Sequence, residues 1–549
     1  MNFLQRVVIV SLTLAGLSCA TAPIESSGIA DPPAGMLKGA VDGGLRVFKG
    51  IPYAAAPIGE ARWKAPSSLP RWNGVRSATE FGPACIQPKV PAASIYHAPD
   101  MPSSEDCLSL NIWAPADAKN APVFFWIHGG AFWYGSSRES LYDGARLAQH
   151  GVVVVTINYR LGVLGWLAHP ELSAESPDAI SGNYGLLDQI QALRWVRQNI
   201  GAFGGDPANV TIAGESAGGL SVVYLMASPA ARGLFAKAIA QSSYMISTPE
   251  LNAGKHGSPS AEQSGRDLAT ALHAADVAAL RKMEAGALTN AAAAARFGPL
   301  GTIDGKVLHR QLIDVFDRGE QAKVPVLAGF NSGEIRSLRI LAPPAPAKIE
   351  DYEGAIRKGY RDVADRFLSL YPATTMAESI LATTRDAMYG WTAQRLVRKQ
   401  TALGVPSYLY FFDHGYPAAD AAGLHGFHAA ELPYVFGTAA RTPPLWPKIP
   451  QTPIETELAD AMLDYWTSFA RSGEPKAGNE PDWPAFGSKS AYMAFTDTPH
   501  PAQDLLPGTF ALHEEVVCRR RAQGDQAWNW NVGILSPPLP DRTASCAMQ

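Results

Sequence analysis

Short apolar runs recur along the chain between longer segments in which apolar residues have helical spacing. The runs are rich in β-branched and aromatic residues. A strand that is apolar along its whole length is buried on both faces, as in a parallel sheet covered by helices. The pattern therefore predicts an α/β fold with a large, mostly parallel central sheet flanked by helices. The expected strands are residues 122–127, 152–157, 210–213, 236–241, 324–330 and 407–412.

Apolar residues three and four positions apart predict helices between these strands. Residues 184–205 and 458–473 show this spacing, and each ends at glycine, as helices often do. Residues 251–300 are rich in alanine and have a helical pattern, so we expect helical insertions that form a partial cap over the sheet. The Pro-rich residues 341–350 predict a surface loop, because strand patterns resume after it. We therefore expect a single α/β domain over residues 21–549.

The first 20 residues, MNFLQRVVIVSLTLAGLSCA, have the pattern of a secretory signal peptide. Arg6 precedes an apolar run that is too short to span a bilayer comfortably, and small residues follow. We expect cleavage after Ala20 and an exported protein, periplasmic or secreted. Lipoprotein anchoring at Cys19 is the alternative, but the three residues before it fit that recognition pattern poorly. No other segment is apolar for 18 residues, so no stable membrane insertion is expected.

Composition and charge narrow the class of protein. The chain has 549 residues, of which 47% are hydrophobic and 17% charged, and this is a globular balance. The formal net charge is −4, and CRRRAQ near the C-terminus is the only cationic run. These features argue against nucleic acid as a partner.

Five cysteines are present, and four remain once the signal peptide is removed. An even number in an oxidising compartment permits two disulfides. Cys85 with Cys107 would close a short loop, and Cys518 with Cys546 would tie down the C-terminal tail. The alternative is that the two C-terminal cysteines stay free.

One candidate nucleophile lies in VTIAGESAGGLSV, residues 210–222, where a strand pattern passes into a helix pattern through Gly-Glu-Ser-Ala-Gly. A Gly-x-Ser-x-Gly motif in this context is typical of the nucleophile elbow, a tight turn that exposes a serine hydroxyl above a sheet. Gly214 and Gly218 remove side chains that would clash in the turn. Ser216 is therefore a candidate nucleophile, and a plain glycine-rich turn is the alternative.

A serine hydroxyl needs a base, and the base needs an orienting acid. In this architecture the chain order is serine, then acid, then histidine. Glu334 follows the strand pattern in VPVLAGFNSGE, and both His425 and His428 follow the next one, so all lie beyond carboxyl ends of strands. Spacing alone leaves either histidine as the base. No ligand cluster such as His-Glu-x-x-His accompanies them, so we expect no metal and no organic cofactor.

Acyl transfer also needs backbone N–H groups that stabilise negative charge on the substrate carbonyl oxygen. FFWIHGGAFWYG supplies a strand followed by a turn of small residues, and the N–H of Ala217 directly after Ser216 would complement it. The alternative for this segment is an ordinary turn. Trp133 and Tyr134 beside it suggest an aromatic-lined pocket, although core packing explains them nearly as well.

Taken together, these segments resemble the type-B carboxylesterases of the α/β-hydrolase fold, which include carboxylesterases, cholinesterases and bile-salt-type lipases. The resemblance runs from about Gly39 to about Phe486, and the last 60 or so residues carry none that can be used. It rests on FKGIPYAAAPIGEARWKAP, SEDCLSLNIWAP, HGGAFWYGSS, NYRLGVLGWL, GNYGLLDQIQALRWVRQNIGAFGGDPANVTIAGESAGG, GFNSGE and HAAELPYVFG.

The resemblance implies roles for individual residues. The segment HAAEL matches the family's catalytic histidine at His428 rather than His425, and Asn331-x-x-Glu334 matches its acid. The first disulfide of the family matches Cys85 and Cys107, whereas a further disulfide of many animal members has no cysteine pair here. The three oxyanion-hole donors match Gly130, Ala131 and Ala217, where Ala131 replaces a commoner glycine.

The expected function is that of a serine carboxylic-ester hydrolase, which acts on a small-molecule ester through an acyl-enzyme on Ser216 with Glu334 and His428. One alternative is a specialised ester, such as a feruloyl ester, a xenobiotic ester or a polyester toxin. Another is an amide or a carbamate, since the same acyl-enzyme chemistry serves both. A non-catalytic binding protein is a remote alternative, because the serine, acid, histidine and oxyanion turn are all retained.

Overall fold

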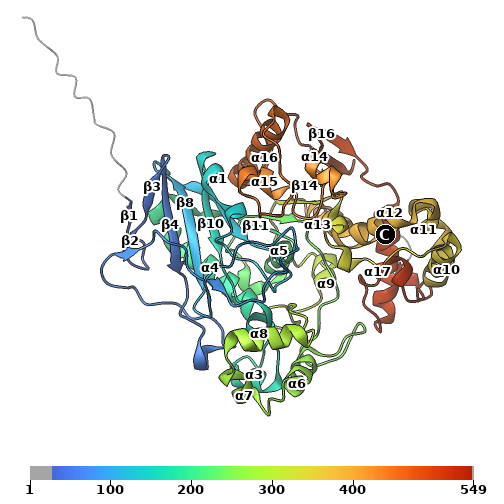
Figure 1. Ribbon diagram of the computed structural model, residues 1–549, viewed down its shortest axis with the longest axis horizontal. Helices are drawn as coiled ribbons and strands as arrows, with labels where there is room; N and C mark the ends of the chain where they lie inside the picture. The colour runs from blue at the N-terminus through green and yellow to red at the C-terminus, as the bar shows by residue number, and fades with distance from the viewer. Residues whose placement is uncertain (1–27, 547–549) are drawn as a thin grey trace, which may run out of the picture.

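The computed structural model describes residues 28–546, and an eleven-stranded sheet runs through its centre (Figure 1). The expected signal peptide and Cys19 lie outside the described residues. From one edge to the other the strands are β16 (Pro499–Gln503), β15 (Ala491–Phe495), β14 (Ser407–Phe412), β13 (Val326–Asn331), β12 (Lys237–Gln241), β11 (Gly205–Glu215), β9 (Ala121–Ile127), β10 (Val153–Ile157), β8 (Ser109–Pro115), β4 (Leu45–Pro52) and β3 (Ala40–Asp42).

The centre of this sheet is parallel and both of its ends are antiparallel. Strands β10, β9, β11, β12, β13, β14 and β15 pair in parallel along that order. Strand β16 pairs antiparallel with β15, and β8, β4 and β3 extend the other end in antiparallel pairs. Short strands form two small sheets: β1 (Ile29–Ala30), β2 (Leu37–Lys38) and β5 (Arg76–Ser77), and β6 (Ala84–Cys85) with β7 (Ser103–Ser104).

The six apolar runs in the sequence are the parallel strands β9 to β14, each within a few residues of the expected bounds except β11, which begins five residues earlier. Alternate residues of β9 face two different hydrophobic cores. Phe125 and Ile127 lie in the core that also contains residues of α4 and α5, whereas Phe124 and Trp126 lie in the core shared with α16. The predicted α/β architecture with helices on both faces of the sheet is therefore confirmed.

The helix patterns are also present. Residues 184–199 form α4, a 3₁₀ turn continues to Phe203, and α16 begins five residues before its expected start. The helices are α1 (Ala145–Gln149), α2 (Gly162–Trp166), α3 (Pro170–Glu175), α4 (Tyr184–Asn199), α5 (Ala217–Ala227), α6 (Ala261–Ala271), α7 (Val277–Lys282), α8 (Ala285–Ala294), α9 (Leu312–Asp317), α10 (Ile349–Tyr360), α11 (Ala364–Leu370), α12 (Met376–Arg385), α13 (Trp391–Ala402), α14 (Pro417–Ala421), α15 (Leu432–Val435), α16 (Pro453–Ser472) and α17 (Thr509–Gln523).

The alanine-rich residues 251–300 form α6, α7 and α8, which lie together with α3 at the bottom of Figure 1. They pack through a hydrophobic cluster of their own, in which Leu280 and Leu288 meet Val163 and Leu164 of α2. The insertion is therefore a helical cap that is attached to the sheet through α2.

The C-terminal region folds back on the molecule through α17 (Figure 1). The cationic run lies in this helix. Arg519 forms ion pairs with Asp362 and Glu515, and the Arg520 guanidinium donates to backbone carbonyls of the tail. A disulfide joins Cys518 to Cys546, so the second pairing is formed and the alternative of free C-terminal cysteines is wrong.

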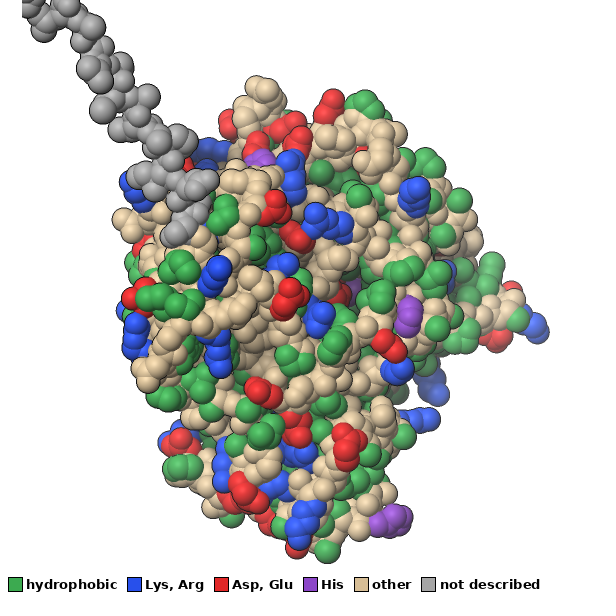
Figure 2. Space-filling model, turned by 60° about the vertical axis from the view of Figure 1, so that its left-hand side comes forward, with side chains coloured by type: hydrophobic (Ala, Val, Ile, Leu, Met, Phe, Trp, Pro, Cys, Tyr) green, Lys and Arg blue, Asp and Glu red, His purple; other side chains and the backbone are tan. Residues whose placement is uncertain are grey.

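On the face shown in Figure 2, acidic and basic side chains are interspersed. Within residues 28–546, no helix is both long enough and apolar enough to span a bilayer.

Candidate active site

Ser216 occupies the sharp turn between β11 and α5. Its backbone has φ 56° and ψ −121°, a conformation that costs a residue with a side chain about 1–3 kcal/mol. The two flanking glycines permit this turn, because a Cβ at Gly218 would lie 2.1 Å from the carbonyl oxygen of Ile127 and one at Gly214 would lie 2.5 Å from Gly218. The strand–serine–helix arrangement expected of a nucleophile elbow is therefore present.

Glu334 and His428 meet beside this turn. Glu334 begins a 3₁₀ turn that follows β13, and His428 lies in the loop after β14. Nδ1 of His428 is hydrogen-bonded to Oε2 of Glu334, and the other carboxylate oxygen of Glu334 accepts the N–H of Asn331 at 2.8 Å. Glu334 is fully buried and His428 is 5% exposed. The acid and the base chosen by the family resemblance are thus in contact.

The second nitrogen of His428 faces the residue that precedes the serine. Nε2 lies 3.0 Å from Oε1 of Glu215, and within residues 28–546 Oγ of Ser216 forms no hydrogen bond. Catalytic contacts often tighten only when substrate binds. The arrangement therefore places His428 next to the elbow without a direct hydrogen bond to Ser216.

The buried carboxylates control the charge of the site. Burial alone lowers the pKa of His428, but the carboxylates of Glu215 and Glu334 outweigh burial and raise that pKa to about 9. Burial raises the pKa of Glu215 to about 8. The titrations of His428 and Glu215 are therefore coupled.

His425, the other candidate base, lies elsewhere. Its Nδ1 is 2.7 Å from Oδ1 of Asp420 and its Nε2 is 3.2 Å from Oδ1 of Asp413. Its side chain is 41% exposed. The hydrogen bond to Asp413 is the main cause that raises the pKa of His425 to about 9. Both ring nitrogens are engaged by carboxylates away from Ser216, so the structure does not bring His425 into the site.

The expected oxyanion turn packs directly against Ser216. A Cβ at Gly129 would lie 3.1 Å from Cβ of Ser216, so the two backbones are in close approach. Gly130 and Ala131 both have positive φ, 102° and 53°. Within the described chain, no hydrogen bond uses the N–H of Gly130, Ala131 or Ala217. Three unengaged N–H donors thus lie directly after Ser216 and directly after Gly129.

Glu431 is a buried site residue that the sequence analysis treated only as part of the HAAEL marker. Its Oε2 accepts from Nδ2 of Asn331 at 2.6 Å, and its Oε1 accepts from Nε2 of Gln241 at 2.9 Å. The same Nδ2 of Asn331 donates to the carbonyl of Phe427 at 2.8 Å. Glu431 therefore ties the acid segment after β13 to the histidine loop, and its place three residues after His428 was the only available signal.

An aromatic side chain that the sequence did not indicate packs against His428. The ring centroid of Tyr389 is 5.3 Å from that of His428, and Tyr244 lies edge-on to Tyr389 at 6.1 Å. Tyr389 belongs to a π-helical turn, Asp386–Gly390, between α12 and α13, and such turns are frequent at functional sites. Trp133, by contrast, packs against Phe297 beside the cap helices.

The chain is similar in sequence to known esterases. The sequence model described as "Carboxylesterase family" matches residues 28–509. The chain is 36% identical to the fumonisin B1 esterase of Sphingopyxis macrogoltabida, over 83% of this chain and 84% of that protein. It is 34% identical to the para-nitrobenzyl esterase of Bacillus subtilis strain 168, over 84% of this chain and 94% of that protein.

Solved structures give the same picture. A PNB esterase structure superposes with a TM-score of 0.75 at 32% identity and covers 87% of this chain and 98% of its own. A carboxylesterase structure from Geobacillus stearothermophilus superposes with a TM-score of 0.73 at 34% identity, over 88% of this chain and 99% of its own. The fold is the α/β-hydrolase fold.

Proposed function

The chain belongs to the carboxylesterase family of carboxylic ester hydrolases, and from this premise we propose that it acts through an acyl-enzyme formed on Ser216. In this proposal His428 is the general base and Glu334 is the acid that orients it. The observation that carries the proposal is the buried hydrogen bond between Nδ1 of His428 and Glu334, formed beside a strained serine elbow.

Chemistry begins from neutral His428, whose Nε2 carries no proton: Oγ of Ser216 attacks the substrate carbonyl carbon and passes its proton to Nε2. Nε2 exchanges its contact with Glu215 for one with Ser216 when the ester binds. His428 then protonates the leaving alcohol, and water hydrolyses the acyl-enzyme by the reverse sequence of proton transfers. Glu334 holds the imidazole in the tautomer that keeps Nε2 available and stabilises the imidazolium.

Negative charge on the carbonyl oxygen is stabilised by the N–H groups of Gly130, Ala131 and Ala217. Ala217 follows Ser216 directly, Gly130 and Ala131 follow the glycine that approaches Ser216, and all three N–H groups are unengaged within residues 28–546, which supports this role. Each such donor contributes about 3 kcal/mol to transition-state stabilisation. Because they are fixed by backbone, the donors need no reorganisation during the reaction.

The proposed substrate is a small ester, and the alternatives are an amide or carbamate and a specialised ester. An amide or carbamate needs stronger protonation of the leaving amine by His428. The relative named fumonisin B1 esterase supports the alternative of a specialised ester. Fumonisin B1 is therefore included in the substrate panel. The two disulfides suit an oxidising compartment, which supports export of the protein after removal of residues 1–20.

Hydrolysis of p-nitrophenyl esters from acetate to palmitate, with aryl esters, anilides and fumonisin B1, tests the proposal. Turnover is expected with esters, and Ser216→Ala is expected to abolish it while circular dichroism shows an unchanged fold. The chain-length profile then sizes the acyl pocket. Ester turnover that survives in Ser216→Ala would overturn the assignment of the nucleophile.

A further inference from the structure

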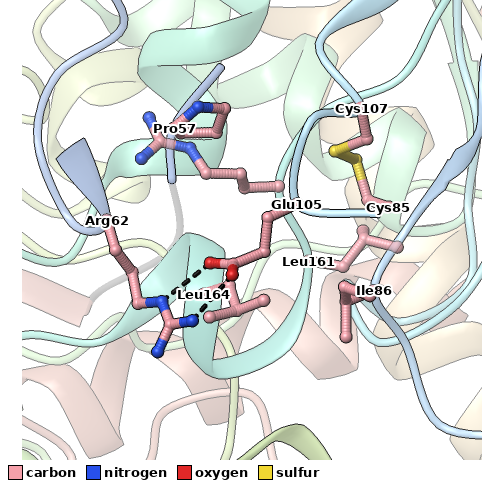
Figure 3. A pocket seen from close by; sticks show the side chains of 9 residues that line it. Pro57, Arg62, Cys85, Ile86, Glu105, Cys107, Leu161 and Leu164 are labelled. Atoms are coloured by element: carbon pink, nitrogen blue, oxygen red, sulfur yellow. Dashed lines mark hydrogen bonds and ion pairs between the residues drawn. A yellow bond between two sulfur atoms is a disulfide. The ribbon is translucent and has the colours of Figure 1, made fainter. Parts of the chain in front are cut away.

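The segment closed by the first disulfide, residues 85–107, contacts two parts of the candidate active site. Its ends are Cys85 and Cys107, whose Cα atoms are 5.0 Å apart. Near the second cysteine, Glu105 accepts two hydrogen bonds from the Arg62 guanidinium, each 2.7 Å (Figure 3). Arg62 also donates to the carbonyl of Met283 in the cap, at 2.8 Å. The segment is therefore anchored at its base by a covalent bond and by a buried ion pair.

The middle of the segment contacts the backbone of the proposed base. Oη of Tyr96 is 2.8 Å from the carbonyl oxygen of His428 and 2.8 Å from Oγ of Ser337. A carbonyl only accepts, so Tyr96 donates its single proton to His428 and accepts from Ser337. Ser337 follows Glu334 by three residues. One phenol thus touches both the histidine loop and the segment that carries the acid.

The phenol is well suited to this contact. Burial raises the pKa of Tyr96 well above its usual range, and the nearby carboxylates of Glu215 and Glu334 raise it further, so the hydroxyl keeps its proton. The ring is fixed edge-on against Trp446, with centroids 5.9 Å apart. Few other conformations are open to a side chain that is held at both its ring and its hydroxyl.

The start of the segment contacts the oxyanion turn. Nε2 of Gln87 donates to the carbonyl of Gly135 at 3.0 Å, and the N–H of Gly135 donates back to Oε1 of Gln87 at 2.9 Å. Gly135 closes the turn that begins with Gly130, and a Cβ there would lie 2.4 Å from Nδ1 of His128. Gln87 therefore fixes the far end of the turn that carries two of the proposed oxyanion donors.

We propose that the disulfide-closed segment is a positioning element of the active site, which acts through Tyr96 on His428 and through Gln87 on the oxyanion turn. The inference rests on the proposed function, because it assigns the segment to the geometry of that same machinery. Tyr96 and Gln87 are positioning residues, since neither is proposed to touch the reacting atoms. The disulfide contributes by holding both contacts in one closed loop.

Tyr96→Phe is the main test, because it removes the hydroxyl and keeps the ring against Trp446. Loss of one hydrogen bond that orients the base is expected to lower kcat about fivefold and to leave KM within about twofold. The rate of inactivation by an organophosphate, which reports attack by the serine, should fall by a similar factor. Gln87→Leu is expected to lower kcat with KM likewise unchanged.

Tyr352→Phe is the matched control. Its hydroxyl donates to the carbonyl of Tyr371 at 3.0 Å in a separate hydrophobic cluster, so the variant loses a comparable buried bond away from the site. Its kcat and inactivation rate are expected to equal those of the wild type. A control that loses kcat as Tyr96→Phe does would show a general effect of destabilisation and would overturn the proposal.

The role of the disulfide is tested by a double-mutant cycle. Cys85→Ser with Cys107→Ser is expected to lower kcat at least as much as Tyr96→Phe does, and adding Tyr96→Phe to it should then cost less than twofold, because coupled sites are not additive. Full additivity would overturn the role of the disulfide. If the cysteine variants fail to fold, Tyr96→Phe and Gln87→Leu still decide the proposal.

Failure of this inference is distinguishable from failure of the proposed function. If Tyr96→Phe and Gln87→Leu both have wild-type kcat and inactivation rates while Ser216→Ala is inactive, the positioning role is wrong and the proposed mechanism stands. If Ser216→Ala retains turnover, the mechanism itself is wrong.

Discussion

Two histidines that lie three residues apart after β14 have opposite environments. His428 is buried, hydrogen-bonded to Glu334 and next to Glu215, which precedes the candidate nucleophile. His425 is 41% exposed on its side chain and lies between Asp413 and Asp420. Both have carboxylate partners and both have a pKa raised to about 9. A raised pKa and an acidic partner therefore do not distinguish the two histidines, and the assignment of His428 as the proposed base rests on its proximity to the serine elbow.

The largest expected effect is a loss of kcat/KM when His428, but not His425, is replaced. His428→Gln should lower kcat/KM by at least about 10⁴-fold, because the base is lost, whereas His425→Gln should stay within about threefold. Steady-state hydrolysis of p-nitrophenyl butyrate measures both. A larger loss of kcat/KM in His425→Gln than in His428→Gln would show that His425 is the base and would contradict the assignment.

The second largest effect is a loss of kcat when Glu334, the hydrogen-bond partner of His428, is replaced. Glu334→Gln keeps the shape of the side chain but removes the charge that orients and stabilises the imidazolium. We expect kcat to fall by about 10³–10⁴-fold, less than for His428→Gln. Asp420→Asn is the matched control at the exposed histidine and should leave kcat within about twofold. Equal effects of the two substitutions would contradict the account.

The third effect is a shift in pH dependence. The base must be neutral to accept the serine proton, and the negative charge of Glu215 raises the pKa of His428. Glu215→Gln removes this charge, so the acid limb of the kcat/KM profile should move to lower pH by about one unit. A profile recorded from pH 5 to 10 measures the shift. His425→Gln is the control and should leave the limb in place; a limb that moves to higher pH in Glu215→Gln would be the wrong sign.

The smallest expected effect is a pH-dependent change in thermal stability when His425 is replaced. Its pKa is raised to about 9 in the folded protein, against about 6.5 in an unfolded chain. The stabilising ion pairs are therefore fully present below pH 6.5 and are lost as the pH rises through 9. The Tm difference between wild type and His425→Gln should be a few degrees or less at pH 6 and should vanish by pH 10. A difference that grows with pH would contradict this assignment.

Much of the fold could be predicted because its central strands are apolar along their whole length. Strands β9 to β14 are buried on both faces, apart from the first residues of β11, and their sequence shows it. The antiparallel strands at the two ends are different. Strand β3 is exposed throughout and β16 largely so, and β4 carries Arg46 and Lys49 among its apolar residues, so no continuous apolar run marks them.

Only those parts of the site that are close together in the sequence could be predicted from local motifs. The elbow is local, since Gly214, Ser216 and Gly218 lie within five residues. The choice between His425 and His428 came from family resemblance, because spacing alone left both open. The contact of Tyr96 with His428 joins residues 332 positions apart, and that of Gln241 with Glu431 joins residues 190 apart. Such contacts follow from the packed fold and have no local pattern.

The central claim is that Ser216 forms a covalent intermediate with the help of His428 and not of His425. Mass spectrometry of peptides after reaction with an organophosphate tests it most directly. The account predicts one adduct, on the peptide that contains Ser216, formed at the wild-type rate in His425→Gln and very slowly in His428→Gln. An adduct on another residue, or equal rates in the two histidine variants, would contradict it.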